Sequence, residues 1–370
     1  MEPKSLHARY DAMHEACVRY YIQDETMESI ARYLKLSRSS VSRLLAEARN
    51  TGMVRISVEA PGGSSSPIAR AVAAIFGVRV HMAQVGEAAS VTTRFERVSR
   101  LAAAILRNSV KDGDFIGVAW GVTVSNIVPY LERYPLHDAT IVQMNGGTNY
   151  HDSSARHVAA ILQALAQTFD ARIIQFPVPA FFDYPTSREA MWSESSVRHV
   201  LGLQEKIDVA IFGVGSIGAK VPSYVYSAGF LDEKETQNMR DEGVVGDVNT
   251  VLFREDGSWE DISLNKRASG LTPQELQAIP RRIGVVADPS RANSLLGALR
   301  ARTITDVVCD DTTAKSLLGL LNPADYQETL AGLDLSITGK SASRGRRQEK
   351  PLRPPNTVIL REVAESRYSS

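Results

Sequence analysis

Hydrogen-bond donors are concentrated on one side of a short predicted helix near the start of the chain. In the segment SRSSVSRLLAEA, at residues 37–48, apolar residues recur at helical spacing, so they share one face and the polar residues share the other. Hydroxyl and guanidinium groups donate to phosphate oxygens and to base edges. The pattern therefore predicts a helix that reads DNA, with candidate contacts at Arg38, Ser39, Ser40, Ser42 and Arg43.

The segment before this helix predicts a second, partner helix. Thr26 is a candidate N-cap of a helix in TMESIARYLKL and a further candidate DNA contact, and Ser37 is a candidate N-cap of the donor helix. Two short helices joined by a tight turn form a helix-turn-helix. Residues 54–58 alternate apolar and polar side chains and predict a strand or wing. The net charge from residue 37 to residue 55 is +3. The alternative is a small helical subdomain with solvated arginines.

Two loops that follow predicted strands are rich in small groups that suit an anion. They are WGVTVS at residues 120–125 and NGGTN at residues 145–149. Glycine turns at helix starts present several N–H donors, so phosphate is the predicted ligand. The candidate residues are Gly121, Thr123, Asn145, Gly146 and Gly147. Arg291, at the start of a later predicted helix, either adds positive charge to this site or is a surface arginine.

Other motifs give little support to cofactor binding or catalysis. GVGSIG at residues 213–218 matches the dinucleotide fingerprint, but Pro222 follows it and no strand ending in an acid does, so a tight loop lining the same pocket is favoured. Asp310 and Asp311 are either a carboxylate pair or, as we favour, the N-cap of the helix that follows. The seven histidines are scattered without metal-ligand spacing. We expect no cofactor, no metal site and no catalytic group.

Composition limits the class of protein. The chain has 370 residues, 44% of them apolar, and a formal net charge of zero, so any DNA contact should be confined to a patch. Cys17 and Cys309 form no CxxC pair, which argues against a disulfide scaffold or zinc site and fits a reducing compartment. The N-terminus lacks a signal-like apolar core, and no run of about 18 apolar residues occurs. A soluble, cytoplasmic protein is expected.

A stretch rich in Pro, Gly and Ser, together with changes in composition along the chain, predicts four segments. They are a helix-turn-helix domain at residues 1–59, a linker at 60–67 (APGGSSSP), an α/β domain at 68–337 and a basic, disordered tail at 338–370. Within the α/β domain, short Ile- and Val-rich strands alternate with amphipathic helices, a pattern typical of a Rossmann-like, mostly parallel sheet. The predicted buried strands are at residues 115–120, 140–145, 172–178, 209–215, 282–288 and 305–311. The tail is either solvated, which we favour, or an auxiliary DNA contact.

These motifs, in this order, resemble the SorC family of bacterial sugar-responsive transcription regulators. The resemblance extends from about residue 20 to residue 321. The segments that carry it are SRSSVSRLLAEARNTGMVRI, DGDFIGVAWGVTV, QMNGG, PVPAFF, FGVGSIG, GVVGDV and VVCDDTTAKSLL. Members of this family look like a helix-turn-helix joined to a phosphosugar-binding α/β domain, which is similar to sugar-phosphate isomerases and has lost catalysis.

The resemblance also implies roles for individual residues. It implies phosphate binding at the two glycine-containing loops, recognition of sugar hydroxyls by Asp247 and a basic contact at Arg291. It implies a homotetramer built as a dimer of dimers, with a palindromic or repeated operator. The predicted function is therefore a DNA-binding transcriptional regulator, not an enzyme, controlled by a phosphorylated sugar or polyol. The alternative is a phosphosugar isomerase-like enzyme with an appended helical head.

Overall fold

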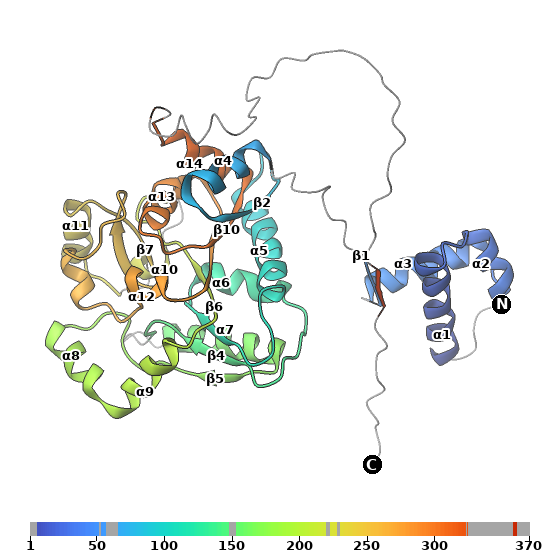
Figure 1. Ribbon diagram of the computed structural model, residues 1–370, viewed down its shortest axis with the longest axis horizontal. Helices are drawn as coiled ribbons and strands as arrows, with labels where there is room; N and C mark the ends of the chain where they lie inside the picture. The colour runs from blue at the N-terminus through green and yellow to red at the C-terminus, as the bar shows by residue number, and fades with distance from the viewer. Residues whose placement is uncertain are drawn as a thin grey trace. The chain divides into compact units, whose positions relative to one another are not determined.

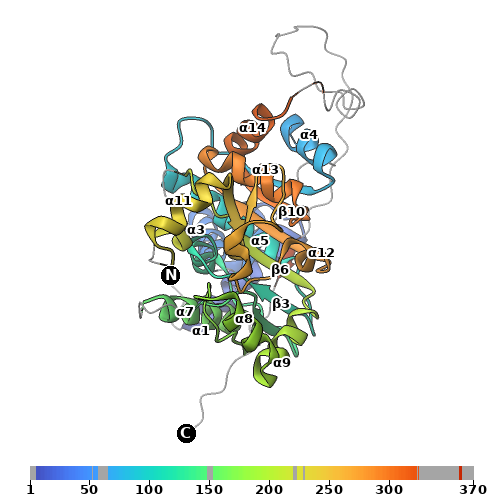
Figure 2. The ribbon, with the colours of Figure 1, turned by 90° about the vertical axis from the view of Figure 1, so that its left-hand side faces the viewer.

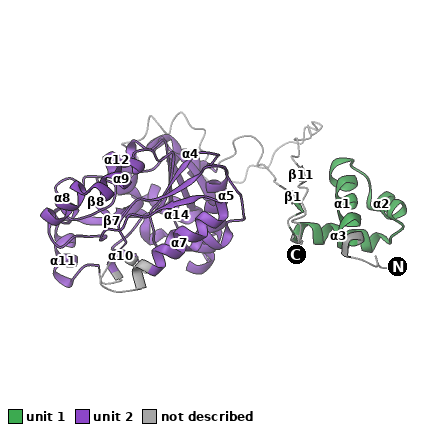
Figure 3. Ribbon diagram, turned by 90° about the horizontal axis from the view of Figure 1, so that it is seen from below, with its two compact units in different colours: residues 1–64, 341–370 green, residues 65–340 purple. Residues whose placement is uncertain are grey.

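The chain divides into two compact units (Figure 3). The computed structural model describes residues 6–51, 53–56, 66–147, 153–219, 223–227, 230–322, 324 and 358–360. One unit comprises residues 1–64 and 341–370, and the other comprises residues 65–340. The division falls inside the predicted linker, and the second unit takes up its last residues, because Ser66 caps helix α4 (Pro67–Phe76) and Pro67 is its first residue.

The N-terminal unit contains the predicted helix pair. Its elements are α1 (Leu6–Cys17), the π-helix η1 (Val18–Ile22), α2 (Met27–Leu34) and α3 (Arg38–Asn50). The Thr26 hydroxyl accepts a hydrogen bond from Ser29 N at 3.2 Å, and the Ser37 hydroxyl accepts one from Ser40 N at 3.1 Å, so both predicted N-caps are confirmed. The apolar stripe of α3 is buried in the core of this unit through Val41, Leu44, Leu45 and Ala48.

A single lysine turns the chain from α2 into α3. Lys35 adopts a left-handed conformation with φ of 53°, and its N–H bonds back to the last turn of α2. After α3, β1 (Val54–Ile56) forms as predicted and pairs antiparallel with β11 (Val358–Leu360). β11 lies in the segment 338–370, for which the sequence predicts disorder, so these three residues form a strand instead. The rest of that segment lies outside the described residues.

The second unit is built on a sheet of seven parallel strands. Their order is β2-β10-β9-β6-β3-β4-β5. They are β2 (Arg79–Ala83), β3 (Phe115–Val118), β4 (Thr140–Gln143), β5 (Arg172–Ile174), β6 (Val209–Gly213), β9 (Arg281–Val286) and β10 (Asp306–Asp310). Six of these lie where the sequence predicts buried strands, and only β2 was not predicted. The predicted α/β architecture is confirmed.

Helices cover both faces of the sheet, so its strands are buried on two sides. On one face lie α5 (Val91–Arg107), α6 (Val122–Ile127) and α7 (Ser153–Phe169), and on the other lie α4, α12 (Pro273–Gln277), α13 (Ala292–Arg300) and α14 (Asp311–Gly319). Successive side chains of a strand alternate between the two faces, so Ile211 of β6 packs beneath the first group and Phe212 packs beneath the second. Figures 1 and 2 both show α4, α13 and α14 gathered together.

A small hairpin and several short helices complete this unit. The hairpin joins β7 (Val244–Val248) to β8 (Val251–Arg254), and a bridge between Val214 and Val248 ties it to the end of β6. The remaining helices are α8 (Pro185–Ser193), α9 (Ser195–Gln204), α10 (Tyr224–Ser227) and α11 (Glu233–Asp241), with short turns η2 (Val128–Tyr130), η3 (Ser263–Lys266) and η4 (Pro289–Arg291). No helix among the described residues is long and apolar enough to cross a membrane.

Candidate functional site

A cavity opens where the winding of the parallel sheet changes direction. From β3 the chain moves outward to β4 and β5, whereas from its neighbour β6 it moves the other way to β9 and β10. Ligands of open α/β sheets bind at the carboxyl ends of strands at such a point. The space that the centre of a water-sized sphere can reach in this cavity is about 70 Å³. Its walls are Phe95, Ala119, Trp120, Gly121, Val122, Thr123, Asn145, Gly213, Val214, Gly215, Ser223, Val225, Asp247, Asn249, Thr250 and Arg291.

The structure brings five of the predicted ligand residues together. Gly121, Thr123, Asn145, Asp247 and Arg291 all line the cavity, although they come from four separate segments. Gly121 and Thr123 follow β3, Asn145 follows β4, Asp247 belongs to β7 and Arg291 ends η4. Long stretches of sequence separate these segments, so their convergence depends on the strand order of the sheet.

Gly146 and Gly147 are not among the lining residues. The Gly146 N–H donates to Ser269 Oγ at 3.0 Å, and its carbonyl accepts from Trp120 Nε1 at 2.9 Å. A Cβ on Gly146 would lie 2.2 Å from the carbonyl oxygen of Pro179, and one on Gly147 would lie 2.7 Å from Val158 Cγ2. The two glycines are therefore required by close packing of the protein on itself, and the Gly146 N–H is already used.

Arg291 is a buried residue of the cavity wall and not a surface arginine. Only 8% of it is exposed, and its Nη1 donates to Val214 O and to Ser223 Oγ, each at 3.2 Å. Burial lowers the pKa of Arg291, and the carboxylates of Asp288 and Asp247 partly offset that shift. A guanidinium group keeps its proton through shifts of this kind. Arg291 is thus the cationic residue among the lining residues that the structure describes.

Asp247 is held rigidly on the hairpin wall. Its Oδ1 accepts from the Tyr226 hydroxyl at 2.7 Å and its Oδ2 accepts from Thr250 N at 3.2 Å. Burial raises the pKa of Asp247, and the hydrogen bonds from Tyr226 and Thr250 oppose that rise. A Cβ on Gly215 would lie 1.7 Å from Asp247 Oδ1, so only glycine fits there. Gly215 of GVGSIG therefore leaves the space that the Asp247 side chain occupies. Residues 213–215 line the cavity, in agreement with the tight loop favoured from the sequence.

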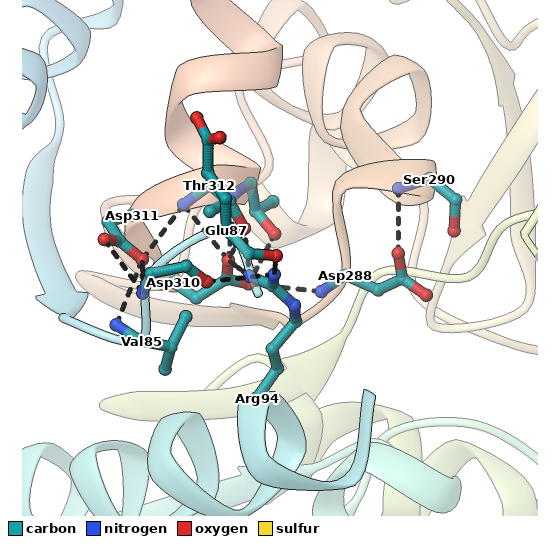
Figure 4. A network of polar contacts seen from close by, with 10 residues as sticks. Val85, Glu87, Arg94, Asp288, Ser290, Asp310, Asp311 and Thr312 are labelled. Carbon is teal, nitrogen blue, oxygen red and sulfur yellow. Dashed lines mark hydrogen bonds and ion pairs between the residues drawn. The ribbon is translucent and has the colours of Figure 1, made fainter. Parts of the chain in front are cut away.

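A network of buried polar contacts supports two walls of the cavity (Figure 4). Asp310 caps α14 by accepting from Thr312 N and Thr313 N, at 3.1 and 3.0 Å, as favoured from the sequence. The same carboxylate accepts from Asp288 N at 3.2 Å and pairs with Arg94 Nη1 at 3.0 Å. Asp288 leads into η4, which carries Arg291, and Arg94 precedes a lining residue of α5. Asp310 therefore fixes both segments.

The candidate DNA-reading side chains lie on the exposed side of α3 and at the start of α2. Thr26, Arg38, Ser39, Ser42 and Arg43 are exposed, and Ser40 is half-buried. Arg38 Nε pairs with Glu28 Oε1 at 2.9 Å, and Arg43 Nη2 lies 3.4 Å from Ser40 Oγ. Because both residues of the Arg38 pair are more than half exposed, water screens the pair and it can exchange for a phosphate.

Similarity to known proteins shows the family to which this chain belongs. The model of the sugar-binding domain family matches residues 69–319. The chain belongs to this sugar-binding domain family. It is 37% identical to a domain of a "possible sugar-binding transcriptional regulator" of Arthrobacter aurescens TC1, with a TM-score of 0.65 over 70% of this chain and 100% of that one. The resemblance to the SorC family is thereby confirmed.

Longer relatives agree with this assignment. This chain is 26% identical to the deoxyribonucleoside regulator of Bacillus subtilis (strain 168), over 82% of this chain and 96% of the other. It is 24% identical to the sorbitol operon regulator of Klebsiella pneumoniae, over 81% of this chain and 95% of the other. The full-length structure of that sorbitol operon regulator gives a TM-score of 0.69 over 84% of this chain and 98% of that one, at 23% identity. The chain is a transcriptional regulator of the SorC type.

Several residues of the sugar-binding domain's cavity were not found from the sequence. Phe95, Ser223 and Val225 come from segments without a motif, and only the fold brings them to the cavity. Asn249 and Thr250 form the turn between β7 and β8, and the pair Asn-Thr lacks the glycine of the usual hairpin signal. Among the described residues, no cluster of His, Cys, Asp and Glu side chains could hold a metal ion.

Proposed function

We propose that this regulator binds a phosphorylated sugar or polyol in the cavity between β3 and β6, and that the bound ligand sets its affinity for operator DNA. The observation that carries the proposal is that one buried cation, Arg291, and one buried carboxylate, Asp247, lie on the walls of the same cavity. The cation suits the anionic end of a ligand, and the carboxylate suits an end that donates hydrogen bonds. A sugar phosphate has matching ends, one dianionic and one rich in hydroxyls.

The phosphate is assigned to the Arg291 side. A guanidinium group forms strong, charge-assisted hydrogen bonds with phosphate oxygens. The hydroxyls of Thr123 and Ser223 and the backbone at Gly121 line the same cavity and supply neutral donors. A Cβ on Gly213 would lie 2.6 Å from Thr123 Oγ1, so this glycine leaves space for the Thr123 side chain. Asn145 completes the predicted ligand set, and Gly146 and Gly147 follow it in the chain without lining the cavity.

The hydroxyl end is assigned to Asp247. A carboxylate accepts hydrogen bonds from hydroxyls and repels phosphate, so the ligand has one preferred direction in the cavity. The relatives named as sorbitol operon regulator and as erythritol catabolism regulatory protein support a sugar or polyol ligand. The cavity favours a regulator over an isomerase, because Asp247 is the one carboxylate among the described lining residues and no histidine, lysine or cysteine is among them.

The DNA contact is assigned to α3, with Arg43 as the principal base-reading residue. α3 is the second helix of the pair, which is the position of the recognition helix in a helix-turn-helix. We further propose a homotetramer built as a dimer of dimers on a palindromic or repeated operator, on the basis of the family resemblance. Binding of the ligand to one arrangement of the sugar-binding domain shifts the DNA-binding equilibrium by its difference in affinity for the two arrangements.

Arg291→Met tests the assignment of the phosphate. Thermal shifts are measured for the full chain with D-fructose 6-phosphate, D-ribose 5-phosphate and D-glucitol 6-phosphate, and with the unphosphorylated compounds. A ligand that binds the native state raises its stability by mass action. We expect the wild type to respond to at least one phosphorylated compound and Arg291→Met to lose that response. Arg300→Met, at the exposed end of α13, the helix that follows Arg291, is the matched control and keeps it. Equal shifts in wild type and Arg291→Met would contradict the assignment.

A further inference from the structure

One acidic side chain lies among the exposed cations of α2 and α3. From residue 26 to residue 43 the chain has four basic residues and one acid, Glu28, and all five side chains are exposed. The four cations are Arg32, Lys35, Arg38 and Arg43. An acid on a surface that contacts DNA repels phosphates, so it lowers affinity unless it has a separate role. The contact that Glu28 makes indicates such a role.

Glu28 is paired with the first residue of α3. Its Oε1 lies 2.9 Å from Nε of Arg38, so this ion pair links the start of α2 to the start of α3. Negative charge is favourable in the first turn of a helix, which suits Glu28, whereas a cation in the first turn of α3 opposes the helix dipole. Arg38 therefore does not stabilise α3 by its position, which favours a role in binding over a role in folding.

The pair leaves part of the Arg38 guanidinium available. A guanidinium group carries five N–H donors in a planar fork. Glu28 approaches this fork at Nε, and the described residues offer the guanidinium no second partner. The N–H groups at the far end of the fork therefore remain for DNA. In the major groove guanine presents two acceptors, O6 and N7, which match the two ends of an arginine fork.

The carboxylate of Glu28 favours a base over a phosphate at this free end. A phosphate there would lie near the carboxylate and be repelled by it, whereas a guanine edge is neutral. In the free protein the side chains of Arg38 and Glu28 are 70% and 58% exposed, so water weakens their ion pair. Insertion of α3 into the major groove excludes that water and strengthens the pair. Glu28 can then hold Arg38 while Arg38 contacts a base.

We propose that Glu28 is a positioning residue that makes Arg38 a reader of guanine, and that each operator half-site has a guanine at the position that Arg38 contacts. The N-terminal residues of a recognition helix contact base edges, and Arg38 is the first residue of α3. Glu28 restricts the direction of the Arg38 side chain and cancels the charge that would attract any phosphate. The pair thus contributes sequence preference more than affinity. This inference rests on the proposed assignment of the DNA contact to α3 and deepens it.

Base preferences of the full-length protein test the proposal. Duplexes that the wild type selects from random DNA define the operator, and fluorescence anisotropy with single base-pair variants gives the preference at each position. We expect Arg38→Ala to lower the preference for guanine at one position of the half-site by about 5- to 150-fold. Glu28→Gln should lower the preference at that position by about 5-fold and leave the other positions unchanged. In the Arg38→Ala background, Glu28→Gln should have no further effect there.

Two more variants separate positioning from charge. Glu28→Asp keeps the charge and shortens the side chain by one methylene, so it should also lower the guanine preference, whereas simple repulsion of phosphates predicts no change. Glu47→Gln is the matched control and keeps the preference, because Glu47 belongs to the same unit and pairs with Arg9 of α1, at 2.8 Å. Unfolding midpoints establish that each variant folds.

Three results would overturn the inference alone. The first is a guanine preference that Glu28→Gln or Glu28→Asp leaves unchanged, and the second is an equal loss of preference in Glu47→Gln. The third is an Arg38→Ala variant that binds every duplex more weakly by the same factor and with a smaller salt dependence, as the loss of a phosphate contact implies. A wild type that selects no sequence would contradict the assignment of the DNA contact to α3, and this inference with it.

Discussion

Replacing Arg94 with methionine should destabilise the sugar-binding domain, because it leaves a buried carboxylate without its cation. Arg94 is 5% exposed, and its guanidinium pairs with Asp310 at 3.0 Å. It also donates to Thr312, to Gly86 O at 3.0 Å and to Glu87 O at 2.7 Å. Methionine fills similar space and supplies no donor. The change therefore isolates the polar contribution of Arg94 from its packing.

The expected loss in the free energy of unfolding depends on the hydrogen bonds that Asp310 retains in the variant. Removing one partner of a buried ion pair destabilises a protein by about 3–5 kcal/mol. Asp310 retains hydrogen bonds from the N–H groups of Asp288, Thr312 and Thr313, so the lower end of that range applies. We expect a loss of about 3 kcal/mol in the free energy of unfolding, which corresponds to about 6–12 °C for a domain of this size.

The dependence on pH gives an independent check. Burial alone would raise the pKa of Asp310, but hydrogen bonds from Thr312 and Thr313 outweigh burial and hold it below its ordinary value. The ionised group therefore stabilises the wild type above about pH 4, and this stabilisation is lost as the pH falls through the folded-state pKa. Without the Arg94 cation the pKa of Asp310 rises. The difference between wild type and variant should therefore be full at pH 7 and should narrow in acid.

Urea unfolding of the full chain, followed at pH 7 and at pH 4, measures both effects. Arg100→Met is the control, because Arg100 lies on the same helix, is 62% exposed in its side chain, pairs with the exposed Glu96 and lies over the Tyr130 ring. Its loss should change stability by no more than about 1 kcal/mol. A change below about 1 kcal/mol for Arg94→Met, or a difference from the wild type that widens in acid, would refute the role assigned to this ion pair.

Three further substitutions have expected outcomes. Lys35→Gly should stabilise the N-terminal unit by about 1 kcal/mol in thermal unfolding, because Lys35 has φ of 53°; a lower midpoint would contradict this. Arg43→Ala should weaken specific operator binding by about 1–3 kcal/mol in a gel-shift assay without changing the unfolding midpoint; equal affinity would remove Arg43 from the reading surface. Gly147→Leu should lower the unfolding midpoint, because a Cβ would lie 2.7 Å from Val158 Cγ2; unchanged stability would show that Gly147 faces open space.

Most of the sheet could be predicted because its inner strands are buried on both faces. Continuous Ile- and Val-rich runs identify β3, β4, β6, β9 and β10, and amphipathic spacing identifies α7 and α13. β2 was not predicted from the sequence because RVHMA mixes charged and apolar residues. The strand lies at a sheet edge, where Arg79 and His81 contact Asp306. The β7–β8 hairpin was not predicted from the sequence because its turn has Asn-Thr, whereas Asn-Gly is the usual sequence signal of a hairpin turn.

The cavity was predicted less completely than the fold. Gly121 and Thr123 follow β3 directly, so the strand itself locates them. Gly146 and Gly147 show why a glycine-rich loop is ambiguous, since glycine permits the close approach of a ligand and of the protein's own backbone equally well. The contributions of Phe95, Ser223 and Val225 depend on where separate segments meet, and spacing along one chain does not encode this.

Coupling between ligand binding in the cavity and DNA binding is the central claim for this regulator. Fluorescence anisotropy of a labelled operator, selected by the full-length protein from random duplex DNA, is measured with and without D-fructose 6-phosphate, D-ribose 5-phosphate and D-glucitol 6-phosphate. We predict that at least one of them changes operator affinity by about 5- to 150-fold, and that its unphosphorylated counterpart acts far more weakly. Operator affinity that no sugar phosphate changes, or that the unphosphorylated compound changes equally, would contradict the account.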